Sequence, residues 1–194
     1  MAKAFDDNER KLIKDKLKEG ALLFIQQQGV RKTSVDELVK YANISKGAFY
    51  LFYTSKELLF FDTIIDYHKK LEKEFLNAIN KHTNNITVDT LTDIISDLLI
   101  NNKPYFVSIF VNSDVEYLNR KLPQEVLSKH VDDDVMLANE LLIPESKSID
   151  TKVFAGALRA AFLTILNEKT IGTDIYNEVF KFIVRGIVQQ LFKD

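Results

Sequence analysis

The sequence of 194 residues contains no cysteine, and only 6 glycines and 3 prolines. The missing cysteines exclude disulfides, thiolate zinc sites, iron–sulfur clusters and cysteine nucleophiles. Scarce glycine and proline argue against an all-β protein with many tight turns and favour long helices. No run of about 18 apolar residues is present, so no membrane span is predicted. The first residues show no signal-peptide pattern, and the expected location is the cytoplasm.

Charge is distributed unevenly, although the formal net charge is only −2. Residues 1–60 carry 11 Lys+Arg against 8 Asp+Glu, while residues 61–194 carry 15 against 20. A basic first part on an acidic remainder is typical of a protein whose first part alone touches a polyanion. A difference of this size also arises by chance, so the charge pattern supports other signals without standing alone.

Helical periodicity divides the first part of the chain into three helices. The first begins with a capping box of Asp6 and Glu9 and ends at Gly29, where the backbone is permissive. A helix over residues 35–42 follows and ends at the break Asn43-Ile44, because Asn tolerates the left-handed conformation. Ser45 caps a third, short helix from Lys46 to about Tyr53. Two short helices joined by a tight turn indicate a helix-turn-helix unit.

The rest of the chain also has helical periodicity, which makes the predicted fold class all-α. A long helix is expected from residue 55 to about 81. Further helices are predicted over residues 88–102, 104–119, 123–142, 151–168 and 174–192, with the three prolines near their joints.

The start of the third helix has residue types suited to the major groove of DNA. A helix N-terminus presents N–H groups to phosphate and its first side chains to base edges. Lys46 can donate to guanine, and the Ala48 methyl can meet a thymine methyl. Tyr50 and Lys56 can reach phosphate, as can Thr33 and Ser34 at the preceding helix start. The alternative is that Ser45 is only a cap, that Lys46 is only solvated and that Tyr50 is only half-buried.

The order of these residues resembles the DNA-binding part of the TetR family of transcriptional regulators. The segments 33–39, 44–50 and 55–59 fall at the family's spacing, and the resemblance covers about residues 8–60. It implies a helix-turn-helix DNA-binding domain over 1–54, followed by a helical ligand-binding and dimerisation domain over 55–194. The DNA-binding residues that it implies are Thr33, Ser34, Ser45, Lys46, Gly47, Ala48, Tyr50 and Lys56.

The resemblance further implies a ligand-responsive, homodimeric transcriptional regulator, with a repressor expected and an activator as the alternative. It would bind double-stranded DNA at an inverted repeat and be released by a small apolar or aromatic effector. A helical effector-binding or adaptor protein without DNA binding is the alternative. No enzyme is expected, because the sequence has no Gly-rich phosphate loop, nucleophile elbow or His-Glu-x-x-His motif.

Two sets of residues in the second part of the chain are candidates for the effector pocket and the dimer interface. Ordinary core packing is the alternative for both sets. The expected pocket residues are Tyr67, His68, Tyr105, Phe106, Phe110, Phe154 and Phe162. The expected interface residues are Ala157, Ala160, Ala161, Thr164, Val179, Phe182, Ile183, Gly186 and Ile187. His130 and Asp134 have a spacing that could hold a metal, but a solvated acidic face explains them more simply, so neither metal nor cofactor is predicted.

Overall fold

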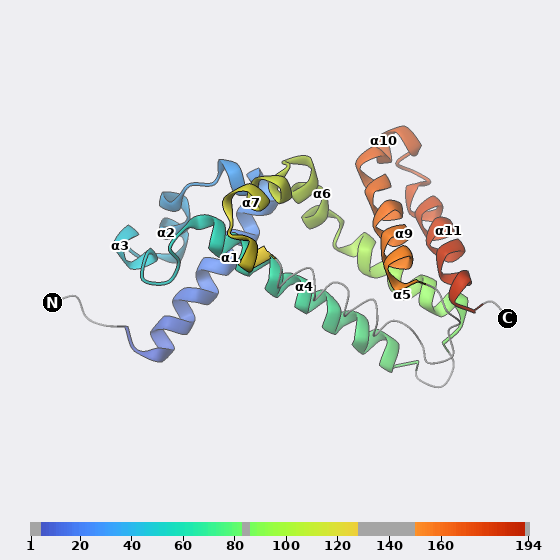
Figure 1. Cartoon of the computed structure of the whole chain (residues 1–194), viewed down its shortest axis with the longest axis horizontal. Helices are drawn as coiled ribbons and strands as arrows, with labels where there is room; N and C mark the ends of the chain where they lie inside the picture. Colours follow the sequence, from blue (N-terminus) through green and yellow to red (C-terminus); the bar gives the residue numbers. More distant parts are fainter. Residues whose placement is uncertain (1–4, 83–85, 128–149, 193–194) are drawn as a thin grey trace. The chain divides into compact units, whose positions relative to one another are not determined.

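A computed structural model describes residues 5–82, 86–127 and 150–192 of the chain (Figure 1). Over these residues the chain forms helices and no strand, so the predicted all-α class is confirmed. The helices form two compact units, residues 1–68 with 108–124 and residues 69–107 with 125–194. The domain boundary expected after residue 54 falls inside the first unit. None of the helices in the described ranges is both long and apolar enough to cross a membrane.

The first unit is a small helical head whose helices begin at polar caps. Its core contains Leu17, Leu38, Phe49 and Leu59, none of which is exposed. It contains α1 (Asp7–Lys32), α2 (Val35–Ala42), α3 (Lys46–Phe49), the first part of α4 (Lys56–Asn80) and α7 (Asp114–Lys121). The predicted capping box of α1 is present, because Asp6 and Glu9 each accept a hydrogen bond from the other's backbone N–H.

The connections within the head follow the predicted backbone chemistry in two places. Gly29 has a φ of 82° and interrupts the helical geometry near the end of α1. Asn43 has a φ of 55° and ends α2 in the left-handed conformation, as predicted. The third helix is shorter than predicted. It ends at Phe49, and the backbone continues through turn-type bonds from Leu51 N–H to the Ala48 carbonyl and from Phe52 N–H to the Phe49 carbonyl.

The second unit is built around α11, which packs against α5 and α9. Figure 1 shows α9 and α11 running side by side. Large apolar side chains such as Phe154, Phe162 and Phe180 form its core. Its helices are α5 (Val88–Asn101), most of α6 (Lys103–Val111), α9 (Thr151–Leu163), α10 (Glu168–Ile171) and α11 (Tyr176–Val188).

Three further predicted helices differ from the structure, among them the one expected over 174–192, which is α11 followed by a 3₁₀ turn, Gln189–Phe192. The helix expected over 104–119 is two helices, α6 and α7, because Ser113 adopts a left-handed φ of 52° between them. The helix expected over 151–168 ends at Leu163 and continues as a 3₁₀ turn, Thr164–Asn167, before α10. Residues 128–149 lie outside the described residues. They include most of the predicted 123–142 helix, with His130 and Asp134.

Candidate nucleic-acid interface

The first turn of α3 presents polar residues outward over a buried apolar base. Ser45 caps the helix, because its Oγ accepts a hydrogen bond from Ala48 N–H at 3.1 Å. Ser45, Lys46 and Gly47 are exposed, whereas Phe49 is completely buried in the head. Tyr50 follows with half of its surface exposed. The free backbone N–H groups and the first side chains of α3 are therefore open to a large ligand.

Lys46 is tied to the first turn of α2 by an ion pair. Its Nζ lies 3.0 Å from Oδ1 of Asp36, and both side chains are more than half exposed. Ser34 at the N-terminus of α2 is exposed as well. We define the α2–α3 surface as Ser34, Ser45, Lys46, Gly47 and Tyr50. The ion pair places the acidic Asp36 carboxylate beside this surface.

Thr33 and Ala48 lie in the interior of the head, not on the surface where the sequence placed them. Thr33 is 1% exposed, and its Oγ1 donates to the Gly29 carbonyl at 2.8 Å. It also accepts a hydrogen bond from Gln28. Ala48 is 9% exposed, so its methyl packs inward and does not face a thymine methyl. Both residues stand at helix starts, where the side that is buried depends on the rest of the fold.

Lys56 uses its ammonium group within the head. The Nζ donates to the carbonyls of Val30, Arg31 and Thr33 at 3.0, 3.1 and 2.5 Å. These three bonds occupy all the donors of a lysine. Burial lowers the pKa of Lys56. A direct phosphate contact by Lys56 stays a prediction, and it would compete with these bonds to the connection between α1 and α2.

Asp114, the first residue of α7, is the head's main polar residue that sequence reasoning missed. It is fully buried, and its carboxylate accepts hydrogen bonds from Val30 N–H at 2.8 Å and from Arg31 N–H at 3.3 Å. Burial raises the pKa of this carboxyl group. More than 80 residues separate the partners in sequence, so no local pattern could have predicted the contact.

Glu37 gives the start of α2 a pH-dependent stability. Its carboxylate accepts from Gln28 Nε2 at 3.0 Å and from the backbone N–H of Ser34 at 2.7 Å. These bonds lower the pKa of Glu37 from 4.5 to about 2. A carboxyl group whose pKa is depressed by folding stabilises the fold above its ordinary pKa and loses that effect as the pH falls.

We expect Glu37→Gln to be less stable than the wild type at neutral pH and to lose less stability on acidification from about pH 5 to pH 2, where carboxylates are protonated. Thermal unfolding followed by circular dichroism across this range measures the difference. Glu116→Gln is a suitable control, because Glu116 is exposed on α7. Parallel pH curves for the wild type and Glu37→Gln would contradict the assignment.

The residues expected to line an effector pocket are divided between the two units. In the second unit, the ring of Phe106 lies against Phe162 with a centroid distance of 4.7 Å and against Tyr105 at 5.2 Å. Phe154 belongs to the same core. Tyr67 and His68 are partly buried residues of the first unit. The side chain of Phe110 lies outside the described part of the chain.

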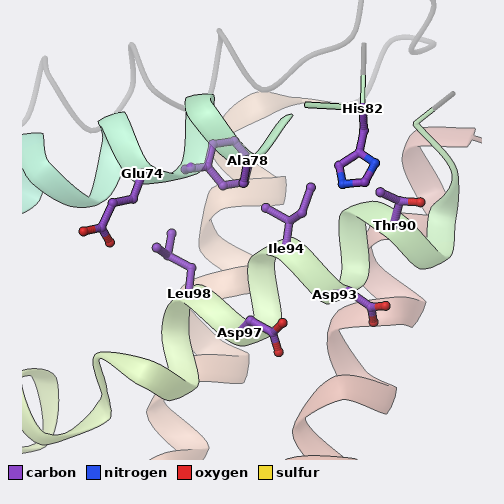
Figure 2. Close-up of a pocket in the computed structure, with 9 residues that line it drawn as sticks. Glu74, Ala78, His82, Thr90, Asp93, Ile94, Asp97 and Leu98 are labelled. Carbon is purple, nitrogen blue, oxygen red and sulfur yellow. The ribbon is translucent and has the colours of Figure 1, made fainter. Parts of the chain in front are cut away.

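A hollow in the second unit has a different lining. Its volume is about 420 Å³. Figure 2 shows acidic side chains at its edge and apolar side chains from α4 and α5. The lining residues are Glu74, Phe75, Ala78, His82, Thr90, Asp93, Ile94, Asp97 and Leu98. No residue of the expected pocket is among them. Within the described residues, no group of three or more acidic or histidine side chains could hold a metal ion.

The residues expected at a dimer interface range from exposed to buried. Phe182 is 80% exposed, and a Cβ at Gly186 would meet no atom within 4 Å. Ala160 is exposed. Ala161 is only 4% exposed and belongs to the core of the second unit, so its methyl offers no surface to a partner. The partly buried members of the set are Ala157, Thr164, Val179, Ile183 and Ile187.

The three-helix head with the polar first turn of α3 exposed places the protein in the helix-turn-helix class. Residues 18–63 match the family model described as bacterial regulatory proteins of the tetR family. The head of the chain is therefore similar to the DNA-binding part of this family of transcriptional regulators.

Relatives and solved structures are consistent with this assignment. An uncharacterized HTH-type transcriptional regulator of Bacillus subtilis, YuxN, is 32% identical over 122 residues, which are 59% of this chain. The match spans only 42% of that protein. The crystal structure of SCO4454, a TetR-family regulator from Streptomyces coelicolor, superposes with a TM-score of 0.69 at 14% identity, covering 94% of this chain and 97% of that one.

A second solved structure, RolR in complex with resorcinol, has a TM-score of 0.57 at 14% identity and covers 97% of this chain and 99% of that chain. At this level of identity, both structural matches establish the fold.

Proposed function

We propose that this protein is a homodimeric transcriptional repressor that binds an inverted-repeat DNA operator and responds to a small effector. The observation that carries the proposal is the exposed first turn of α3, with Ser45, Lys46 and Gly47 standing over the buried Phe49. An α-helix fits the major groove, and the N-terminal residues of the second helix of a helix-turn-helix contact base edges there. In this arrangement Lys46 donates to base acceptors, and the Ser34 and Tyr50 hydroxyls bind phosphate.

Homodimerisation is supported by the α9–α11 surface, which we define as Gly156, Ala160, Phe182 and Gly186. A Cβ at Gly156 or Gly186 would meet no other atom within 4 Å, and Phe182 is 80% exposed. Small residues on two adjacent helices allow close helix approach, and an exposed aromatic is a strong anchor for a partner. We propose that a second copy of the chain covers this surface in a four-helix contact, which places two heads on one duplex.

Effector binding is proposed for the second unit, where Tyr105, Phe106 and Phe162 bring three aromatic rings together. RolR, which shares the fold, binds resorcinol. Rings grouped in this way favour an apolar or aromatic ligand. Release of a bound duplex by small aromatic compounds, with resorcinol as the first probe, tests this part. A protein whose DNA affinity none of these compounds changes would contradict the aromatic class of effector.

Asp36 should weaken DNA binding, because its carboxylate competes with phosphate for Lys46. We expect Asp36→Asn to raise the affinity for duplexes of any sequence by up to about fivefold, the size of an exposed ion pair. Fluorescence anisotropy with a labelled duplex at low salt measures the change. A reduced affinity would instead mean that Asp36 orients Lys46 toward the bases.

Enrichment of duplexes from a random-sequence library tests the proposed function. We expect an inverted repeat whose half-sites lie about one helical turn apart, bound by two protomers with an affinity that falls as salt rises. Failure to bind any duplex even at low ionic strength would contradict the proposal. It would favour a helical effector-binding or adaptor protein that does not act on DNA.

A further inference from the structure

Asp114 and Lys56 both bind the backbone of the connection between α1 and α2, one through a carboxylate and the other through an ammonium group. Asp114 accepts the N–H groups of Val30 and Arg31, while Lys56 donates to the carbonyls of the same two residues. Lys56 also donates to the Thr33 carbonyl. We call this set of contacts the α1–α2 clasp. It fixes the peptide groups that lead directly into Ser34, the N-cap of α2.

The clasp is built with a carboxylate buried so completely that it cannot touch a ligand. Asp114 has no exposed surface. A buried charge costs stability unless hydrogen bonds and an opposite charge compensate for it. Here two backbone N–H groups supply the hydrogen bonds, and the Lys56 ammonium supplies the charge. An apolar side chain in this place would leave both N–H groups without an acceptor, so the carboxylate holds the two peptide groups in fixed positions.

The geometry of α7 fits this role. Ser113 adopts a left-handed conformation immediately before Asp114, which starts α7 at the position where the carboxylate meets the connection. A further hydrogen bond connects the same helix to α4, because the Tyr117 hydroxyl donates to the Glu57 carboxylate at 2.6 Å. Hydrogen bonds therefore hold both α7 and the start of α4 next to the connection that leads into α2.

We propose that Asp114 is a positioning residue for DNA binding. Acting with Lys56, it sets the entry to α2. The placement of the first turn of α3 follows through the tight turn after α2, where Ile44 N–H donates to the Val39 carbonyl at 3.0 Å. The inference rests on the proposed function, because its consequence is the affinity for a specific duplex. It assigns Lys56 to holding the α1–α2 connection, in place of the phosphate contact expected from the sequence.

The test uses Asp114→Asn, with Glu116→Gln as the control that removes an exposed charge from the same helix. A duplex enriched by the wild-type protein and a scrambled duplex are the probes, at a temperature where circular dichroism shows each variant fully folded. We expect Asp114→Asn to bind the enriched duplex at least about tenfold more weakly, since charged hydrogen bonds are lost, and to bind the scrambled duplex with nearly wild-type affinity. Glu116→Gln should match the wild type on both.

A purely structural role gives a different result, because a variant that is merely less stable binds both duplexes normally once it is folded. That outcome would overturn the proposal. A wild-type protein that binds no duplex would instead contradict the proposed function. Failure of the positioning role and failure of the proposed function are therefore distinguishable.

Lys56→Met provides an independent test if Asp114→Asn does not fold. A clasp role predicts a loss on the enriched duplex with an unchanged salt dependence. A phosphate contact predicts a loss on both duplexes and a salt slope lower by about one unit, which would contradict the proposal. In the double variant, the loss of binding free energy on the enriched duplex should be smaller than the sum of the two single losses, because both residues act on one connection.

Discussion

Gly29→Ala should lower the free energy of unfolding by about 3–5 kcal/mol, because two costs add at this position. The φ of 82° is strained for any residue with a Cβ. A Cβ would also lie 2.7 Å from Oδ2 of Asp114 and 2.8 Å from Nδ2 of Asn112. The Asp114 carboxylate would have to move away from Val30, which breaks a hydrogen bond to a buried charge. Urea unfolding followed by circular dichroism measures the loss.

Gly47→Ala is the matched control for this prediction. Its Cβ would meet only Ser45 Oγ, at 3.9 Å, and its backbone does not have a positive φ. Because Ala favours a helix over Gly, Gly47→Ala should be as stable as the wild type or slightly more stable. A Gly29→Ala protein that unfolds at the wild-type urea concentration would show that Asp114 does not occupy the space above Gly29.

Phe182→Glu should convert the proposed dimer into monomers without destabilising the second unit. The side chain is 80% exposed and contributes little to the core of its own chain. In a dimer it would be buried next to the open space above Gly186, and a carboxylate there would be desolvated without a partner. We expect the dimer dissociation constant to rise by at least about a hundredfold, the effect of losing a strong interface anchor.

Sedimentation velocity over a range of concentrations measures this change. Leu12→Glu is the control, because Leu12 is 62% exposed on α1 of the first unit and the substitution is the same in kind. It should leave the association state unaltered. A Phe182→Glu protein that sediments as the wild-type dimer would place the interface elsewhere, and a monomeric wild type would contradict homodimerisation itself.

The local features of the head could be predicted from sequence because they depend on neighbouring residues. The limits of α2 follow from the Ser34 cap and from Asn43, and both lie where the sequence placed them. The break between α6 and α7 was missed because Ser113 is neither Gly nor Pro, yet it adopts a left-handed φ. The helical spacing of apolar residues in the sequence continues through such a residue. The break between the two helices is therefore visible only in the structure.

The candidate site was predictable only in outline. The sequence correctly indicated an exposed Lys46 at the start of α3. Burial of Thr33 and Ala48 depends on α1, α2 and α3 packing together, which residue type alone does not specify. The three bonds of Lys56 and the two bonds of Asp114 join residues 23 to 84 positions apart. Long-range polar contacts of this kind leave no periodic signal in a single sequence.

The most direct test of the central claim compares the wild type and Lys46→Ala on the enriched duplex and on a scrambled one. Lys16→Ala, which removes an exposed lysine from α1, controls for the loss of a positive charge. If α3 reads base edges, Lys46→Ala should lose about 1–3 kcal/mol on the enriched duplex and much less on the scrambled one. An equal loss on both duplexes, or no loss on either, would contradict base recognition by the first turn of α3.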